Sequence, residues 1–80
     1  MFQHKSINQL QNGETATIVG YGSDEIPIKL YEMGLLPGVT LTKKQQLPFK
    51  GPVYLRIEGN PNAIALRRSE ADLVLIESIL

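Results

Sequence analysis

The sequence predicts a mainly β fold: a small five-stranded barrel with a short helix between strands one and two and a helical turn before the last strand. Two observations support this prediction. Short segments alternate between apolar and polar residues, as half-buried strands do, and turns rich in glycine and proline separate them. One amphipathic segment, which ends at Gly34-Leu35-Leu36-Pro37-Gly38, interrupts the alternation. With 80 residues and no cysteine, we expect one domain, residues 1–80, without disulfide bonds.

The N-terminal part of the chain is expected to form a capped turn and then the first strand. Ser6 is a suitable N-cap for a single helical turn that ends at Leu10. Asn12-Gly13 marks a turn. The segment Thr15–Val19 is rich in β-branched residues and alternates, so we predict the first strand there.

The helix is predicted to be about nine residues long, beginning near Asp24 and ending before Gly34. Asp24 is a suitable N-cap, and Pro27 would occupy the first turn, where its missing N–H costs little. Glu25 and Lys29 have the spacing of a stabilising i,i+4 ion pair. Gly34 is expected to adopt a positive φ and end the helix. The residues that share the core-facing side are Ile26, Leu30 and Met33.

Four more strands follow the helix. They are predicted at Val39–Gln45, Val53–Glu58, Ala63–Leu66 and Leu73–Glu77, with a helical turn at Ser69–Asp72. Short strands and tight turns in so small a chain favour a closed or nearly closed barrel, because closure removes exposed strand edges. An SH3-like barrel fits the length best. An OB-type barrel is the alternative, although its helix normally lies between strands three and four.

Composition and charge argue against several functions. Eight basic and eight acidic residues give a net charge of zero, whereas nucleic-acid binding depends on an excess of Lys and Arg. A membrane span needs about 20 consecutive apolar residues, and the longest apolar run, Leu73–Ile76, is far shorter. The N-terminus lacks the apolar region of a signal peptide. We therefore expect a cytoplasmic protein that neither binds nucleic acid nor inserts directly into a membrane.

An ordered set of motifs across roughly seventy residues resembles the FeoA family, the small SH3-like cytosolic proteins of bacterial ferrous iron transport. The chain departs from the usual family pattern at Met33, where leucine is more common, and at Lys50, where a small or acidic residue is more common. The matching motifs are Ile7 and Leu10 before Gly13, the run Leu30-Tyr31-Glu32-Met33-Gly34-Leu35-Leu36-Pro37-Gly38, then Pro48 and Gly51-Pro52, and finally Ala65-Leu66-Arg67-Arg68-Ser69-Glu70-Ala71.

The resemblance implies a partner and no activity of the chain's own. The partner would be the cytosolic part of a FeoB-type membrane transporter of ferrous iron, which would recruit the chain to the inner face of the membrane. The same fold resembles the C-terminal domain of DtxR-type iron-dependent repressors. The alternative function is therefore a stand-alone SH3-like regulatory domain that binds a peptide or a divalent metal.

The residues themselves offer little chemistry. His4 is the only histidine, and no cysteine is present to share a metal with it. Glu70 and Asp72 could bind a divalent cation weakly, but Glu70 fits better as a charge at a helix N-terminus. The segment Gly20-Tyr21-Gly22 lacks the spacing of a phosphate-binding loop. We predict no catalytic residue, no cofactor and no metal site.

A partner-binding surface is the remaining expectation, and we assign it to Leu36, Phe49 and Lys50. Phe49 lies in a loop stiffened by Pro48 and Pro52, so binding through this loop would cost little entropy. With Leu36 it would form an apolar patch. In the alternative interpretation, which the sequence supports equally, Phe49 folds back over an open end of the barrel. The scattered basic residues, including Lys43-Lys44, are interpreted as solvated surface.

Self-association is a separate expectation. The apolar strand at Leu73–Ile76 would be able to pair with another copy if it lay at a sheet edge. We therefore expect a monomer or a weak homo-oligomer.

Overall fold

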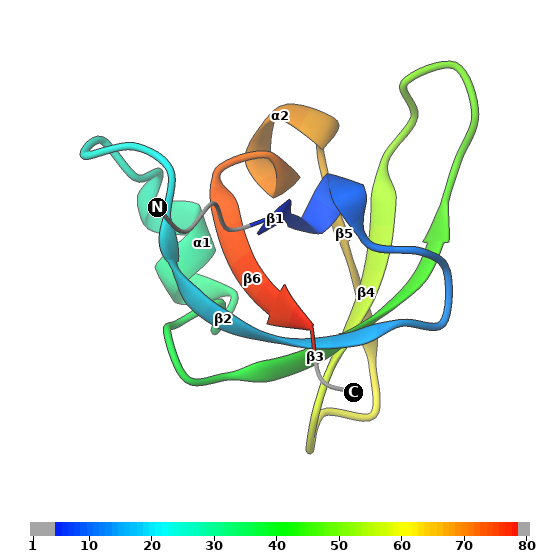
Figure 1. Ribbon diagram of the computed structural model, residues 1–80, viewed down its shortest axis with the longest axis horizontal. Coiled ribbons are helices and arrows are strands. Elements are labelled where there is room, and N and C mark those ends of the chain that lie inside the picture. Colours follow the sequence, from blue (N-terminus) through cyan, green and yellow to red (C-terminus); the bar gives the residue numbers. More distant parts are fainter. Residues whose placement is uncertain (1–4, 79–80) are drawn as a thin grey trace.

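The structure, a computed structural model, describes residues 5–78 of the chain (Figure 1). Its six strands form one antiparallel sheet in the order β1-β6-β2-β3-β4-β5, which curls around the core. No helix among the described residues has the length and hydrophobicity that a bilayer crossing requires. The elements in chain order are β1 (Lys5–Ser6), η1 (Ile7–Gln9, a 3-10 helix), β2 (Thr15–Tyr21), α1 (Ile28–Glu32), β3 (Thr40–Gln46), β4 (Val53–Ile57), β5 (Ala63–Leu66), α2 (Arg68–Ala71) and β6 (Val74–Ser78).

The predicted mainly β class is confirmed, but the sheet has six strands rather than five. The additional strand is β1, whose two residues pair with Ile76 and Leu75 of β6. Pairing on both sides makes β6 an interior strand, since β2 hydrogen-bonds to its other edge. The condition for self-association through this strand, a position at the sheet edge, is therefore not met.

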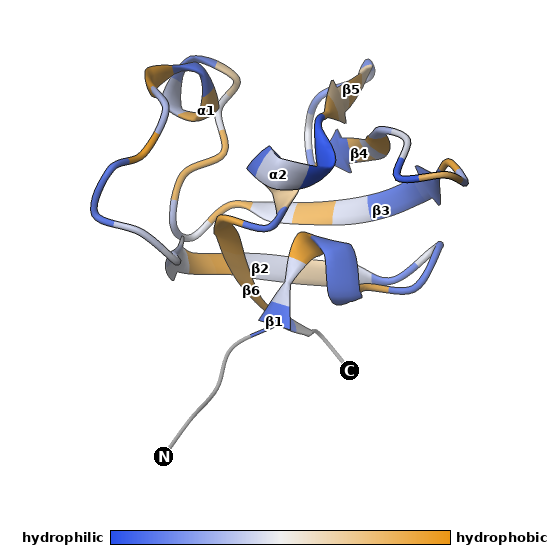
Figure 2. Ribbon diagram, turned by 90° about the horizontal axis from the view of Figure 1, so that it is seen from above, coloured by the Kyte–Doolittle hydropathy of each residue, from blue (hydrophilic) through white to orange (hydrophobic). Residues whose placement is uncertain are grey.

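The core lies inside the curled sheet, under η1, α1 and α2. Alternation places Ala16 and Ile18 of β2 inward, and Leu41 of β3 likewise. Figure 2 shows that β6 is a largely hydrophobic strand, consistent with its interior position. The buried hydrophobic residues are Ile7, Leu10, Ala16, Ile18, Leu30, Leu35, Leu41, Val53, Leu55, Leu66, Ala71, Val74 and Ile76.

The helix α1 differs from its prediction at the start and agrees with it at the end. Pro27 has an extended ψ of 129° and acts as the N-cap, so the helix is five residues long and Asp24 lies outside it. A proline disfavours helical geometry in the residue before it, and this explains why Ile26 is not helical. Lys29 forms its ion pair with Glu70 of α2, at 2.9 Å, instead of with Glu25.

Gly34 ends α1 as expected, with a φ of 85°. Its N–H donates to the carbonyl oxygen of Tyr31 at 3.0 Å, and the N–H of Leu35 donates to that of Leu30 at 3.0 Å. These two bonds define a Schellman motif, in which glycine avoids the steric cost of the left-handed conformation. The chain then turns at Gly38 and enters β3.

Candidate docking surfaces

The loop between β3 and β4 is a tight turn with an unusual backbone. The N–H of Gly51 donates to the carbonyl oxygen of Pro48 at 3.1 Å, and the N–H of Leu47 donates to that of Pro52 at 3.1 Å. Between them, Phe49 and Lys50 both have a φ of 58°. A four-residue turn with positive φ at both central positions is of type I′, which matches the twist of a β-hairpin. We call residues 48–51 the hairpin tip.

The hairpin tip adopts this conformation without glycine at either central position. A side chain in the left-handed region costs roughly 1–2 kcal/mol, which is why Asn and Gly dominate such turns. Gly51, the following residue, is required for another reason. A Cβ built on it would approach the Cβ of Leu47 to 2.8 Å and the carbonyl oxygen of Pro48 to 3.0 Å. The tip is therefore both strained and tightly held.

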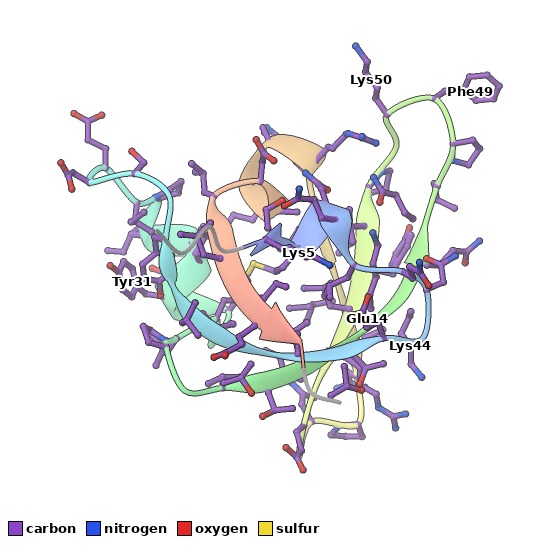
Figure 3. The ribbon with its side chains drawn as sticks, viewed as in Figure 1. Lys5, Glu14, Tyr31, Lys44, Phe49 and Lys50 are labelled. Atoms are coloured by element: carbon purple, nitrogen blue, oxygen red, sulfur yellow. The ribbon has the colours of Figure 1, made fainter. Side chains whose placement is uncertain are left out.

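Phe49 projects from this turn into solvent. Its side chain is 99% exposed, and Figure 3 shows the ring pointing away from the barrel. Of the two interpretations given by the sequence, the one in which Phe49 folds back over the barrel is therefore excluded. Backbone strain combined with an exposed aromatic ring is typical of binding sites, where the surrounding structure maintains an unfavourable local geometry.

Leu36 does not join Phe49 in one patch. The turn after α1, which contains Leu36, and the hairpin tip lie at opposite ends of the molecule in both ribbon views (Figures 1 and 2). Leu35 is buried in the core, whereas Leu36 is 41% exposed. The other exposed apolar residues near Leu36 are on α1, Ile28 and Tyr31. The three predicted docking residues are thus divided between two surfaces.

Tyrosines fix the end of α1 against β2. The Tyr21 hydroxyl donates to the carbonyl oxygen of Leu35 at 2.6 Å, and its ring lies 5.6 Å from that of Tyr31, tilted by 57°. Burial raises the pKa of Tyr21, and the neighbouring Tyr31 raises it further. Tyr21 therefore remains protonated as a hydrogen-bond donor at neutral pH.

Lys43 is buried, contrary to its assignment to a solvated basic surface. Only 2% of it is exposed, and its Nζ donates to Leu10 O at 2.7 Å, Asn8 O at 3.2 Å and Gln46 Oε1 at 2.6 Å. Burial lowers the pKa of Lys43 and the charge of Arg68 lowers it further, while Glu14 acts in the opposite direction. The neighbouring Lys44 sits at a register shift between β3 and β4 and is exposed.

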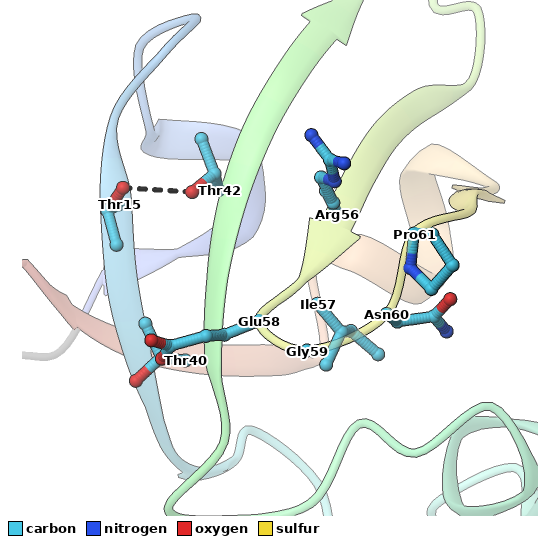
Figure 4. A pocket seen from close by; sticks show the side chains of 9 residues that line it. All are labelled: Thr15, Thr40, Thr42, Arg56, Ile57, Glu58, Gly59, Asn60 and Pro61. Carbon is cyan, nitrogen blue, oxygen red and sulfur yellow. Dashed lines mark hydrogen bonds between the residues drawn. The ribbon is translucent and has the colours of Figure 1, made fainter.

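A pocket of about 560 Å³ opens on the outer face of β2, β3 and β4 (Figure 4). Thr15 and Thr42 line it and share a hydrogen bond of 2.9 Å, and Arg56 lies beside Thr42 on the next strand. Glu58 and the β4–β5 turn complete the wall. The alternation that predicted the strand Val39–Gln45 gave no indication of a pocket. The pocket offers hydroxyls and two opposite charges, without a nucleophile activated by a base.

Residues 5–78 contain no ready group of metal-ligating side chains. This part of the chain contains no cluster of three or more His, Cys, Asp or Glu side chains. Glu70 is already engaged, since its Oε1 accepts the N–H of Arg67 at 2.8 Å and its carboxylate pairs with Lys29. Burial raises the pKa of Glu70, but these contacts outweigh it and leave the pKa below its ordinary value. His4 lies outside the described residues.

Comparison with known proteins identifies the family. A model of the FeoA domain matches residues 5–78. The chain belongs to the FeoA family. It also superposes over its whole length on the FeoA-like protein of Clostridium acetobutylicum, covering 92% of that chain, with a TM-score of 0.82 and 25% identity. No match is found among curated protein sequences.

A second solved FeoA supports the fold assignment. FeoA of Stenotrophomonas maltophilia, determined with zinc, is 25% identical, with a TM-score of 0.71 and coverage of 90% of this chain and 88% of that one. That protein is described as a prokaryotic SH3 domain protein and is proposed to act as a bacterial ferrous iron transport activating factor. The SH3-like prediction is therefore confirmed, and the OB-type alternative is not.

The predicted similarity to metal-dependent repressors is also confirmed for the fold. A manganese-dependent transcriptional repressor, solved with manganese, matches 99% of this chain with 38% of its own, at a TM-score of 0.86 and 14% identity. Identity this low shows a common fold and nothing about shared ligands.

Proposed function

We propose that this FeoA protein is a non-enzymatic accessory and regulatory protein of ferrous iron uptake, and that it binds the cytosolic part of a FeoB-type membrane transporter. The observation that carries the proposal is the side chain of Phe49, 99% exposed on a strained and tightly hydrogen-bonded turn. A backbone held in this way loses little conformational entropy on binding, and the aromatic ring that it presents can fill a pocket of a partner.

The main contact of the proposed complex is at Phe49 and Lys50. Leu36 belongs to a separate surface at the far end of the molecule, so it serves as a second contact rather than as part of the same patch. In this account the protein is cytoplasmic, reaches the inner face of the membrane through its partner, and is a monomer or a weak homo-oligomer. It requires no cofactor of its own.

Isothermal titration calorimetry tests the proposal directly. The purified chain is titrated into the cytosolic domain of the FeoB-type transporter of the same organism. We expect saturable binding at a 1:1 ratio, with weaker binding after Phe49→Ala combined with Leu36→Ala. Both side chains are exposed, so the double variant is expected to fold. A wild-type chain that shows no binding heat and no co-elution contradicts the proposal.

The alternative is a stand-alone regulatory domain that binds a peptide or a divalent metal, and the fold shared with a manganese-dependent repressor is the observation in its favour. Anaerobic titration with Fe(II) or Mn(II) separates the two functions. Tight uptake at a fixed stoichiometry supports the alternative. Uptake that is weak and non-stoichiometric supports an accessory protein whose ligand is another protein.

A further inference from the structure

We infer that the surface which receives the hairpin tip is a narrow apolar pocket rimmed by carboxylates, into which Phe49 inserts as a rigid anchor. The inference rests on the proposed function and adds to it the chemistry of the partner's surface. Three features of the described residues support it: the rigidity of the tip, the isolation of the ring, and the sign of the charge along the hairpin.

Hydrogen bonds, close packing and flanking prolines hold the hairpin tip in one conformation. Hydrogen bonds of 3.1 Å close the turn at Gly51 and again at the pair Leu47 and Pro52. The Cα of Gly51 is so close to Leu47 that a Cβ would approach it to 2.8 Å. Flanking prolines restrict the backbone further. A partner that meets this turn meets a fixed shape, so binding orders very little of the chain.

The ring of Phe49 is isolated as well as exposed. Apart from Phe49, the exposed large hydrophobic residues of the described chain are on β2, on α1 or in the turn after it: Val19, Ile28, Tyr31 and Leu36. In Figure 3, Tyr31 and Phe49 lie on opposite sides of the molecule. A single projecting ring cannot pair with a broad apolar surface, but it fits a pocket of its own dimensions.

The charge of the hairpin specifies what surrounds that pocket. Residues 40–57 contain four basic side chains and no Asp or Glu, although the whole chain is neutral. Lys50 is at the tip itself, next to Phe49, and is exposed. Acidic residues lie away from the tip: Glu14 adjoins Lys43 at the base of the hairpin, and Asp24 and Glu25 occupy the loop before α1 on the other side of the molecule. Carboxylates around the receiving pocket would complement Lys50 and guide the encounter. The four basic residues are Lys43, which is buried, and Lys44, Lys50 and Arg56.

A lipid surface fits these observations less well than a protein pocket. The interface of a fluid bilayer has no fixed shape, so a strained and rigid turn gains nothing over a flexible one there. One aromatic ring and one lysine also provide too little energy for stable attachment, since even a single myristoyl chain binds membranes only marginally. Rigidity is an advantage when the receiving surface is itself shaped.

The experiment compares variants that separate the side chains from the turn. The double substitution Phe49→Asn with Lys50→Gly introduces the residue pair that type I′ turns prefer, so this turn-preserving variant keeps the hairpin and melts at or above the wild-type temperature. We expect it to bind the transporter's cytosolic domain at least about 30-fold more weakly, the loss typical of an anchor residue. Asn62→Ala, which truncates an exposed side chain in the turn between β4 and β5, outside both docking surfaces, is the control and should bind like wild type.

The charge of the rim is tested by Lys50→Glu. Reversal of this charge should weaken binding by about 10-fold at low salt, and the difference from wild type should shrink as salt increases. A co-sedimentation assay with vesicles of phosphatidylcholine and phosphatidylserine tests the lipid alternative, and we expect no pelleting. Pelleting of the wild type that the turn-preserving double variant loses would assign the tip to lipid and overturn the inference.

The outcomes distinguish this inference from the proposed function. If the wild type does not bind the cytosolic domain, the proposed function fails and the inference fails with it. If the wild type binds and the turn-preserving double variant binds equally well, docking occurs elsewhere and only the inference fails. If Lys50→Glu strengthens binding, insertion of Phe49 still stands, but the proposal that carboxylates surround the pocket is wrong.

Discussion

The ammonium group of Lys43 donates a hydrogen bond of 2.7 Å to the backbone carbonyl oxygen of Leu10, 33 residues away in the sequence. Lys43 also donates to the carbonyl oxygen of Asn8. Carbonyl oxygens in the last turn of a helix have no donor within the helix, so Lys43 supplies the donor that η1 lacks. The base of the β3–β4 hairpin is thereby tied to the N-terminal segment. The buried Lys43 side chain thus caps the C-terminal end of η1.

Loss of the Lys43 ammonium should destabilise the fold. Lys43→Met keeps most of the side-chain volume but removes the donor from one buried and two part-buried acceptors, so we expect the free energy of unfolding to fall by about 1–3 kcal/mol. Lys44→Met is the matched control, because Lys44 is exposed and should change stability by less than about 0.5 kcal/mol. Urea denaturation followed by circular dichroism measures both. Equal stability of the two variants would contradict a structural role for Lys43.

The pH dependence of stability should also report on Lys43. Its pKa in the folded protein is below the ordinary value of 10.5, so between the two values the unfolded chain binds more protons. The free energy of unfolding therefore rises with pH in that window. The raised pKa of Tyr21 makes the free energy of unfolding fall with pH, but only above the ordinary tyrosine value of 10.0. Stability is therefore measured below that pH. Lys43→Met should abolish the rise, and a rise that persists in the variant must come from another group.

The ion pair between Lys29 and Glu70 should contribute at neutral pH and disappear in acid. The pKa of Glu70 is lowered in the folded state, so its contribution is present above the ordinary value of 4.5 and is lost as pH falls through the folded-state pKa. Glu70→Ala also removes the acceptor of the Arg67 N–H and should cost about 1–2 kcal/mol at pH 7. Glu32→Gln, an exposed change on α1, is the control. A deficit of Glu70→Ala that is the same at pH 7 and at pH 3 would argue against the ion pair.

Two glycines should respond differently to alanine. Gly51→Ala places a Cβ 2.8 Å from that of Leu47, so the hairpin must shift and the free energy of unfolding should fall by about 1–3 kcal/mol. Gly20→Ala places its Cβ in open space and should be neutral or slightly stabilising. Thermal melts distinguish them. Similar melting temperatures would show that the hairpin tip is looser than the structure indicates.

Alternation and turn chemistry predicted most of the sheet, because both act locally. The strand at Val53–Ile57 and the end of α1 at Gly34 follow from residues within a few positions of each other. The predicted start of α1 was wrong. Asp24 is a suitable N-cap, but Pro27 disfavours helical geometry at Ile26, so the helix begins only after Pro27. The strand Lys5–Ser6 is too short to show a period, so only its pairing with β6 reveals it.

The burial of Lys43 was missed although the sequence contains a signal for it. Leu41 faces inward, and a period of two places Lys43 on the same face. The charge of the side chain indicates solvent exposure, and the pattern indicates burial. The separation of Leu36 from Phe49 is different in kind, because it depends on how the hairpin and α1 are placed around the barrel and has no local signal.

The most direct test of docking through the hairpin tip is a nuclear magnetic resonance titration. The ¹⁵N-labelled chain is mixed with the unlabelled cytosolic domain of the transporter, and amide signals are followed along the sequence. The account predicts that the largest shifts and broadening cluster at residues 47–51, with smaller changes near Leu36. Changes confined to the threonine pocket of β2, β3 and β4, or a spectrum that does not change at all, would contradict it.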